Sequence, residues 1–205
     1  MIDLSQPNLS KIEKKLILKV LNSTKLVDGI FQDMAEKKIK NMIKSNYVAV
    51  TQSCSSALEV AAILLKLKPK DEVLVPSFTF TSTANAIVMR GAKPVFVDVD
   101  EHSLNINLED LEKKINKRTK AIFVVHYGGF CTNIDKLIKI KRKYNLPLIE
   151  DAAHAFMAKY KNKYLGTFGD ISTFSFHSTK NIVGAQCGAL VINNKKFIKL
   201  ARKGI

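Results

Sequence analysis

Lys180 and Asp151 are the two side chains whose setting most clearly predicts chemistry. An apolar run, 146–149, leads into Glu150-Asp151, and a second run, 171–176, leads to Lys180 in the turn that follows it. Each run is typical of a buried strand, so we expect both groups at the carboxyl edge of a sheet. An amine that forms a Schiff base, with a carboxylate that keeps a pyridine nitrogen protonated, is what a pyridoxal phosphate enzyme requires.

A second candidate feature is the segment 53–56, Ser-Cys-Ser-Ser, which joins a predicted strand at 47–51 to a helix. Small hydroxyl residues at a helix start leave backbone N–H groups and the positive dipole end open to a phosphate. Ordinary N-capping by Ser53 or Ser55 explains the same residues equally well. Ser175, at the end of a later strand, is a further candidate for contact with a phosphate.

Three other residues each allow two interpretations. Phe80 follows the predicted strand 72–75 and could stack on a flat cofactor ring, although aromatic residues after strands more commonly belong to a core. His154, three residues after Asp151, could reach the phenolic oxygen of such a ring or could be a polar residue beneath a loop. Asp151 itself could be an ordinary helix N-cap.

The charge of the chain has two possible explanations. Its 205 residues carry a formal charge of +15, mainly from lysines spread over the whole length. Nucleic-acid surfaces favour arginine for bidentate contacts and interleave aromatic residues with basic ones, and this chain does neither. A genome that prefers lysine codons explains the charge, with an anionic partner as the alternative. We therefore expect no nucleic-acid partner.

The composition also bears on location. The sequence has no apolar stretch of transmembrane length, and its first residues lack the basic head and apolar block of a signal peptide. Cys54, Cys131 and Cys187 are too few and too scattered for a disulfide framework or a metal site. We expect a cytoplasmic protein with no membrane insertion and no metal.

The apolar pattern predicts an α/β fold in which strands and helices alternate. Two amphipathic helices are expected within 10–44, the first with a capping box from Ser10 and Glu13. Strands are expected at 47–51, 72–75, 94–97, 121–125, 146–149, 171–176 and 188–192, and further helices at 53–66, 81–90, 108–115 and 133–144.

This alternation predicts a mainly parallel seven-stranded sheet with helices on both faces. We expect one structural domain overall, with an N-terminal helical segment at 1–46 and a large domain at 47–205. Ligands bind such sheets beyond the carboxyl ends of the strands. Asp151, His126, Lys180 and the loop around Ser53 all fall at such ends.

Several separated motifs together resemble the DegT/DnrJ/EryC1/StrS family, which are sugar aminotransferases of pyridoxal phosphate (PLP) fold type I. The resemblance runs from about Gln6 to the last residue and is carried by segments 76–80, 91–99, 150–154 and 174–181. Segments 53–54, 58–59, 82–86 and 125–127 are most similar to the branch that makes dTDP-4-amino-4,6-dideoxygalactose for enterobacterial common antigen.

The resemblance implies a role for each matching residue. Lys180 would bind the cofactor covalently and Asp151 would pair with its pyridine nitrogen, as the catalytic pair; His154 would face the ring hydroxyl, Phe80 would stack on the ring, and Ser55, Ser56 and Ser175 would hold the phosphate. It further implies pyridoxal 5'-phosphate as cofactor, amino transfer from L-glutamate to a dTDP-linked 4-keto-6-deoxy sugar for enterobacterial common antigen or lipopolysaccharide, and a homodimer.

The chain departs from the family pattern in two ways. Ala185-Gln186-Cys187 stands where the family has Gly-Glu-Gly, so a carboxylate and two turn-forming residues are lost. The chain is also much shorter than family members, and we expect the small C-terminal domain to be absent. The alternative to an active aminotransferase is therefore a truncated, inactive remnant that still folds; a lysine-rich nucleic-acid or scaffold protein is a third possibility.

Overall fold

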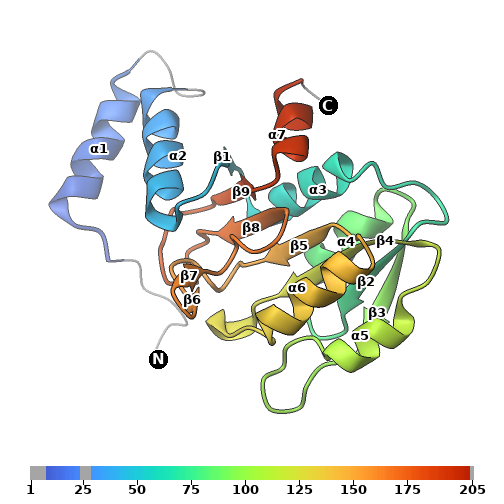
Figure 1. Cartoon of the computed structure of the whole chain (residues 1–205). Helices are drawn as coiled ribbons and strands as arrows, with labels where there is room; N and C mark the ends of the chain where they lie inside the picture. The colour runs from blue at the N-terminus through green and yellow to red at the C-terminus, as the bar shows by residue number, and fades with distance from the viewer. Residues whose placement is uncertain (1–7, 24–28, 204–205) are drawn as a thin grey trace.

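The main sheet has seven strands, and their order across it differs from their order in the sequence. In this computed structural model, which describes residues 8–23 and 29–203, the order is β1-β9-β8-β5-β4-β2-β3 (Figure 1). The strands are β1 (Tyr47–Thr51), β2 (Glu72–Pro76), β3 (Lys93–Val97), β4 (Thr119–Val125), β5 (Leu148–Asp151), β8 (Ile171–Ser175) and β9 (Gly188–Ile192). All pairs from β8 to β3 are parallel, whereas β9 runs antiparallel to β1 and β8. The predicted mainly parallel α/β sheet is confirmed.

Helices cover both faces of the sheet and bury two separate hydrophobic cores. The helices are α1 (Lys11–Leu21), α2 (Ile30–Ile43), α3 (Cys54–Leu64), α4 (Thr81–Val88), α5 (Leu108–Lys114), α6 (Ile134–Lys143) and α7 (Lys195–Arg202), with a short 3-10 turn η1 (Tyr127–Gly129). Apolar side chains of α2, α5 and α6 form one core, and those of α3, α4 and α7 form the other. Burial on both faces explains why the strands read as nearly continuous apolar runs.

The first helix differs from the others because it buries none of its side chains in the described structure. Its start follows the prediction, since Ser10 and Glu13 form the expected capping box. Most of its large apolar side chains are exposed, as are Leu9 just before it and two residues at the start of α2; the exposed residues are Leu9, Ile12, Leu16, Ile17, Leu18, Leu21, Ile30 and Met34.

Two local predictions differ from the structure, and two elements of the structure were not predicted. The helix expected at 81–90 ends earlier, at Val88, although Gly91 has the left-handed φ of +72° expected at a helix end. The strand expected at 146–149 is β5, Leu148–Asp151, so Asp151 ends the strand instead of following it; the segment after it consists of turns, which excludes the alternative of a helix N-cap. Helix α7 and a two-stranded hairpin were not predicted. The hairpin strands, β6 (Lys159–Tyr160) and β7 (Lys163–Tyr164), are too short to show a period-2 pattern.

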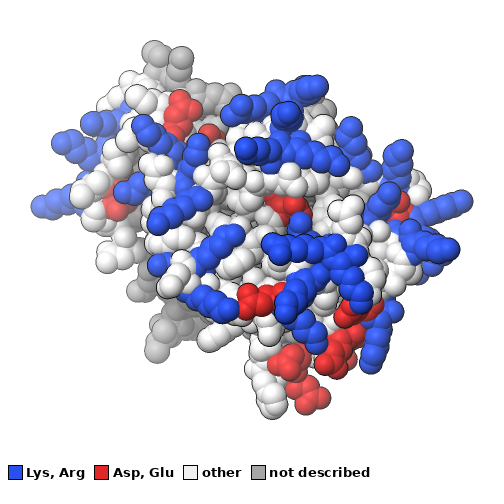
Figure 2. All heavy atoms as spheres, viewed as in Figure 1, with Lys and Arg blue, Asp and Glu red and all other residues white. Residues whose placement is uncertain are grey.

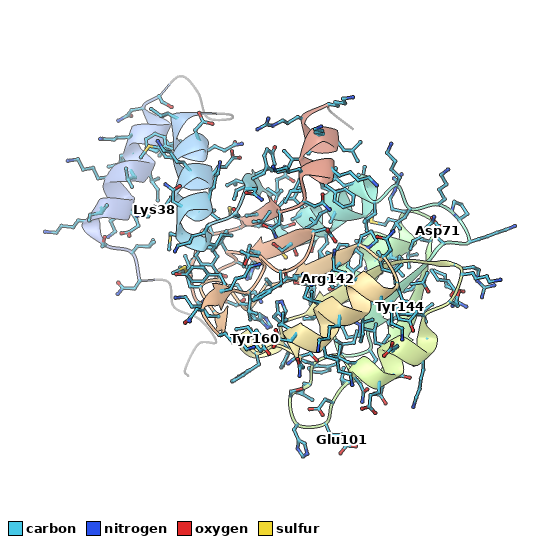
Figure 3. All side chains as sticks on the ribbon, viewed as in Figure 1. Lys38, Asp71, Glu101, Arg142, Tyr144 and Tyr160 are labelled. Carbon is cyan, nitrogen blue, oxygen red and sulfur yellow. The ribbon has the colours of Figure 1, made fainter. Side chains whose placement is uncertain are left out.

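Ion pairs and tyrosine hydroxyls tie the surface helices together. Lys143 and the Tyr144 hydroxyl both donate to Glu112, at 2.8 and 3.1 Å, and so join α6 to α5. Figure 3 labels Tyr144, the C-cap residue of α6. Lysine and arginine side chains are spread over much of the face in Figure 2, as the sequence indicated. Among the described residues, no helix is both long and apolar enough to cross a membrane.

Gly188 is the first residue of β9, as the strand expected at 188–192 predicts, and it is in close contact with another segment. A Cβ atom at this position would lie 2.4 Å from the backbone nitrogen of Cys54 and 2.4 Å from the carbonyl carbon of Ser53. Only glycine therefore lets the turn before α3 lie directly on the sheet.

We predict that Gly188→Ala lowers the free energy of unfolding by about 1–3 kcal/mol, because the added methyl group must displace backbone atoms. Urea unfolding followed by circular dichroism measures the loss. Gly184→Ala is the matched control, since its Cβ would lie no closer than 3.2 Å to any neighbour. An equal loss in the two variants would contradict the close approach.

Candidate active site

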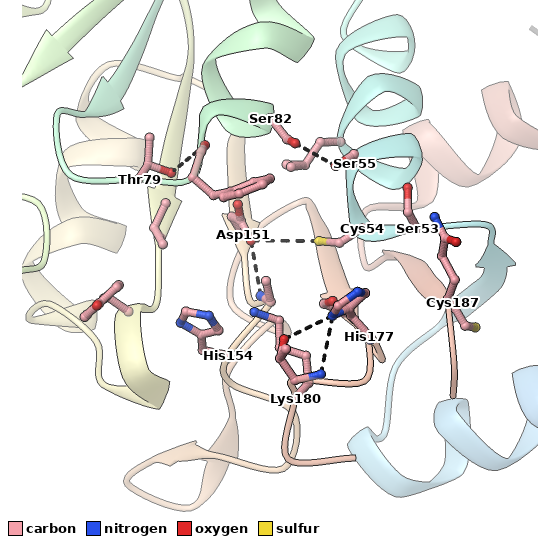
Figure 4. Close-up of a pocket in the computed structure, with 18 of the residues that line it drawn as sticks. Ser53, Cys54, Ser55, Thr79, Ser82, Asp151, His154, His177, Lys180 and Cys187 are labelled. Atoms are coloured by element: carbon pink, nitrogen blue, oxygen red, sulfur yellow. Dashed lines mark hydrogen bonds between the residues drawn. The ribbon is translucent and has the colours of Figure 1, made fainter. Parts of the chain in front are cut away.

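One cavity of about 620 Å³ lies at the carboxyl ends of the parallel strands, where the sequence placed the site. Its walls come from the start of α3, the segment before α4, the end of β5 and the loop that follows β8. Asp151 and Lys180 both line it, as Figure 4 shows. The volume is within the usual range for small-ligand pockets.

Asp151 is a buried carboxylate with hydrogen-bond donors but no cationic partner. Its Oδ2 accepts from the Thr83 hydroxyl at 2.7 Å, and its Oδ1 accepts from the Ala153 N–H at 3.1 Å. Burial raises the pKa of Asp151, against the lowering effect of these donors. No ion pair reaches it from any residue that the structure describes. A cation at this position would therefore satisfy an uncompensated charge.

The neighbouring carboxylate, Glu150, is fully satisfied by protein groups. Its oxygens accept from His126 Nε2 and from the backbone N–H groups of Gly166, Phe168 and Gly169, the first two at 2.8 Å. Burial alone would raise the pKa of Glu150. The hydrogen bond from His126, the charge of His126 and the N–H groups of Gly169 and Gly166 outweigh burial and hold the pKa below its usual range. Glu150 therefore anchors the loop 166–169, and only Asp151 is available to a ligand.

Lys180 lies in the loop after β8, where its backbone N–H donates to the His177 carbonyl oxygen at 2.9 Å. Its Nζ makes no ion pair or hydrogen bond with the described residues, so the amine is available to a ligand. Its charge acts on two other groups of the cavity wall, since it helps to lower the pKa of His154 and opposes the rise in that of Cys54.

His154 faces the same cavity, although the residues around it form turns and not the helix that was considered. The Gly128 N–H donates to its Nδ1 at 3.3 Å, so the neutral ring carries its proton on Nε2. Partial burial and the positive charge of Lys180 lower the pKa of His154. The negative charge of Asp151 acts in the opposite direction but does not outweigh them. The residue is thus a neutral hydrogen-bond donor at neutral pH.

The serines predicted to bind phosphate are only partly brought together. Ser55 and Ser175 line the cavity, and the Ser55 hydroxyl lies 2.6 Å from that of Ser82. Ser56 is not part of the lining, because its hydroxyl faces that of Ser53, 3.1 Å away. Ser53 is the N-cap of α3 and accepts from the Ser56 N–H. The capping interpretation therefore holds for Ser53, while Ser55 remains open to an anion.

Aromatic side chains line one wall and the mouth of the cavity. Phe80 is 75% exposed and is not a core residue, so its ring is free to cover a ligand. Phe78 and Tyr127 meet edge to face with centroids 4.7 Å apart, and Tyr127 meets His154 in the same way at 5.6 Å.

Several residues of the cavity were not assigned a role from the sequence. Thr79, His177, Thr179 and Gln186 line it, and Thr83 donates to Asp151 from behind. No local signal identifies Thr83, because its partner Asp151 lies 68 residues further along the chain. Among the described residues no cluster of metal ligands occurs.

The cavity fits pyridoxal phosphate by the chemistry of its side chains. A flat ring with a protonated nitrogen would satisfy the unpaired Asp151, and Lys180 offers an amine for covalent attachment. Hydroxyl groups of Ser55, Ser82, Ser175 and Thr179, beside the N-terminal end of α3, suit a phosphate.

Comparisons with known proteins agree with this geometry. Residues 7–203 match the model of the DegT/DnrJ/EryC1/StrS aminotransferase family. GDP-perosamine synthase of Escherichia coli O157:H7 is 38% identical over 195 residues, which are 95% of this chain and 54% of that protein. The spore coat polysaccharide biosynthesis protein SpsC of Bacillus subtilis is 35% identical over 193 residues, 94% of this chain and 50% of that protein.

A solved structure extends the agreement to three dimensions. Escherichia coli GDP-4-keto-6-deoxy-D-mannose-3-dehydratase with bound hydrated PLP superimposes with a TM-score of 0.92 at 28% identity, covering 98% of this chain and 54% of that one. The chain thus spans about half the length of the relatives that it matches.

We predict that Asp151→Asn stabilises the cofactor-free protein by about 1 kcal/mol at neutral pH, because a buried charge without a cation is removed. Folding raises the pKa of Asp151, so stability falls as the pH rises from the unfolded pKa, about 4, to the raised folded pKa, and the full loss persists above it. The advantage of the variant should therefore grow between pH 4 and pH 8, as urea unfolding would measure. A wild-type protein that is more stable than the variant at pH 8 would contradict this account.

Proposed function

The chain belongs to the DegT/DnrJ/EryC1/StrS aminotransferase family, and on that premise we propose that it carries out pyridoxal phosphate-dependent transfer of an amino group to a nucleotide-linked sugar. The observation that carries the proposal is the convergence of Lys180 and the unpaired Asp151 on one cavity. Because the chain spans about half the length of its relatives, the complete reaction is part of the proposal.

The cofactor is pyridoxal phosphate, in keeping with the family and with the solved relative that holds it. When bound, it supplies an electron sink for the electron pair of a bond broken next to nitrogen. Asp151 would pair with the ring nitrogen and keep it protonated. Phe80 would cover one face of the ring and exclude water from it, and His154 would donate from Nε2 to the ring hydroxyl.

Three side chains of the cavity wall would bind the phosphate and move a proton. Ser55 and Ser175, with the first turn of α3, would fix the phosphate and so hold the ring in register with Asp151. Lys180 would anchor the cofactor covalently and, once released by substrate, would move a proton as a free amine. Its position after β8 gives Nζ access to the cavity.

We propose a nucleotide-linked 4-keto-6-deoxy sugar as amino acceptor and L-glutamate as donor, within cell-surface polysaccharide synthesis. The names of the relatives support this class, because one is a GDP-perosamine synthase and another a polysaccharide biosynthesis protein. Sequence motifs favour a dTDP-linked sugar and the relatives' names favour a GDP-linked one. Turnover of each sugar nucleotide in parallel separates the two.

A homodimer is proposed on the resemblance alone. The exposed apolar side chains of α1 and α2 are compatible with a partner surface.

The second candidate function, an inactive remnant that still binds the cofactor, is supported by Ala185 at the position of a family glycine. Its φ of +59° is costly for any residue other than glycine.

We predict that incubation with pyridoxal phosphate followed by borohydride leaves a stable pyridoxyl group on Lys180, which peptide mass spectrometry locates. Lys180→Ala should lose both this adduct and the visible absorbance of the bound cofactor. Lys161→Ala is the matched control, because its side chain pairs with Asp135 on the surface.

An adduct spread evenly over the 29 lysines would contradict the proposed site. Activity is measured separately, as formation of pyridoxamine phosphate from L-glutamate and its reoxidation by a 4-keto sugar nucleotide. Cofactor on Lys180 without either half-reaction would favour the inactive remnant.

A further inference from the structure

Two threonine hydroxyls connect the cavity wall to the hidden side of the Asp151 carboxylate. Thr79 Oγ1 lies 2.8 Å from Thr83 Oγ1, which lies 2.7 Å from Asp151 Oδ2. Thr83 is fully buried at the start of α4, whereas Thr79 lines the cavity. We call these two hydrogen bonds, from Thr79 to Thr83 and from Thr83 to Asp151, the relay. The relay begins at the cavity wall and ends on Oδ2 of Asp151, whereas the Ala153 N–H donates to Oδ1.

The direction of the two hydrogen bonds follows from counting protons. A hydroxyl has one proton, and Thr83 gives its own to the carboxylate. The Thr83 oxygen must therefore accept, and the Thr79 hydroxyl is its donor. Thr79 is also 3.3 Å from the Phe80 carbonyl oxygen, but the contact with Thr83 is the shorter one. Donors chained in this way strengthen one another.

We propose that Thr83, with Thr79 behind it, is a positioning residue that keeps Asp151 ionised and aims it at the ring nitrogen of the bound cofactor. This inference rests on the proposed function, because it assigns the purpose of the relay to the same site. A hydroxyl group that donates to Asp151 stabilises the ionised carboxylate relative to the neutral acid. Unlike a lysine or an arginine, it does so without placing a cation where the ring nitrogen would bind.

Other groups around Asp151 do not replace the relay. The Cys54 thiol is 4.0 Å from Oδ1, and burial and the Asp151 charge raise its pKa, so it stays neutral. His126 and His154 lower the pKa of Asp151 only through their charges. Lys180 shares the cavity but makes no ion pair with Asp151, and Glu150 is held by its own donors. Thr83 is therefore the only side chain among the described residues that donates to Asp151 within 3.5 Å.

The test is a pH titration of the Asp151 side-chain carbon by NMR on cofactor-free protein labelled with 13C-aspartate, with Asp151→Asn to assign the signal. In Thr83→Val the midpoint should rise by about one pH unit, since one hydroxyl–carboxylate hydrogen bond is lost. Thr83→Ser should restore the wild-type midpoint. Thr79→Val should give a smaller rise, because it removes only the second donor.

Thr173→Val is the matched control. Thr173 is a buried threonine on β8 opposite Asp151, and its hydroxyl makes no hydrogen bond to that carboxylate. It should leave the midpoint unchanged. Equal midpoints in Thr83→Val and wild type, or an equal rise in Thr173→Val, would overturn the proposal. If Thr83→Val does not fold, an unchanged midpoint in Thr79→Val overturns the relay.

A second measurement relates the relay to the cofactor. The dissociation constant of pyridoxal phosphate at pH 7 should rise several-fold in Thr83→Val and return toward wild type as the pH is raised, because a higher pH restores the ionised carboxylate. A pH-independent loss would contradict a role through ionisation. Failure of the proposed function shows itself differently, as absence of the Lys180 adduct in wild type, and it leaves the carboxyl titration interpretable.

Discussion

The site depends on two adjacent buried carboxylates at the end of β5 that are turned to opposite faces of the sheet. Side chains alternate along a strand, so Glu150 and Asp151 cannot share an environment. Glu150 meets His126 and three backbone N–H groups, and its charge holds the loop 166–169 in place. Among the described residues, Asp151 accepts from the Thr83 hydroxyl, the Ala153 N–H and, at 4.0 Å, the Cys54 thiol, and no cation contacts it. Glu150 therefore stabilises the loop 166–169, and Asp151 is left to contact a ligand.

Parallel strand ends gather the remaining groups around Asp151. β5 lies between β4 and β8, so the segments after these two strands border Asp151 on both sides. The segment after β4 supplies Tyr127 and the Gly128 N–H that orients His154, and the loop after β8 supplies Lys180. The antiparallel strand β9 closes the arrangement, because Gly188 lets the turn that begins α3 lie against the sheet.

The sequence predicted the main sheet and the chemical pair because both depend on local patterns. Continuous apolar runs marked all seven strands, and the polar residues after two of them marked Asp151 and Lys180. The sequence could not tell which serine hydroxyls at the start of α3 face the cavity; that of Ser56 lies against the N-cap residue Ser53 instead. The close approach at Gly188 was not predicted, because a contact between distant segments leaves no local signal. Thr83 escaped for the same reason, since its partner is 68 residues away.

The buried charge of Asp151 lowers the stability of the cofactor-free protein and raises its affinity for a cationic ligand. A buried carboxylate with a raised pKa and no cation costs folding free energy, and two hydroxyl donors only reduce that cost. A ligand that brings a positive ring nitrogen converts the same carboxylate into one half of a desolvated ion pair, which strengthens in a medium of low dielectric. The folding free energy lost by burying the Asp151 charge is thus offset when the cofactor binds and supplies the cation. Replacing Asp151 with a well-packed neutral residue would remove the cost and the affinity together, so this position cannot be optimised for stability alone.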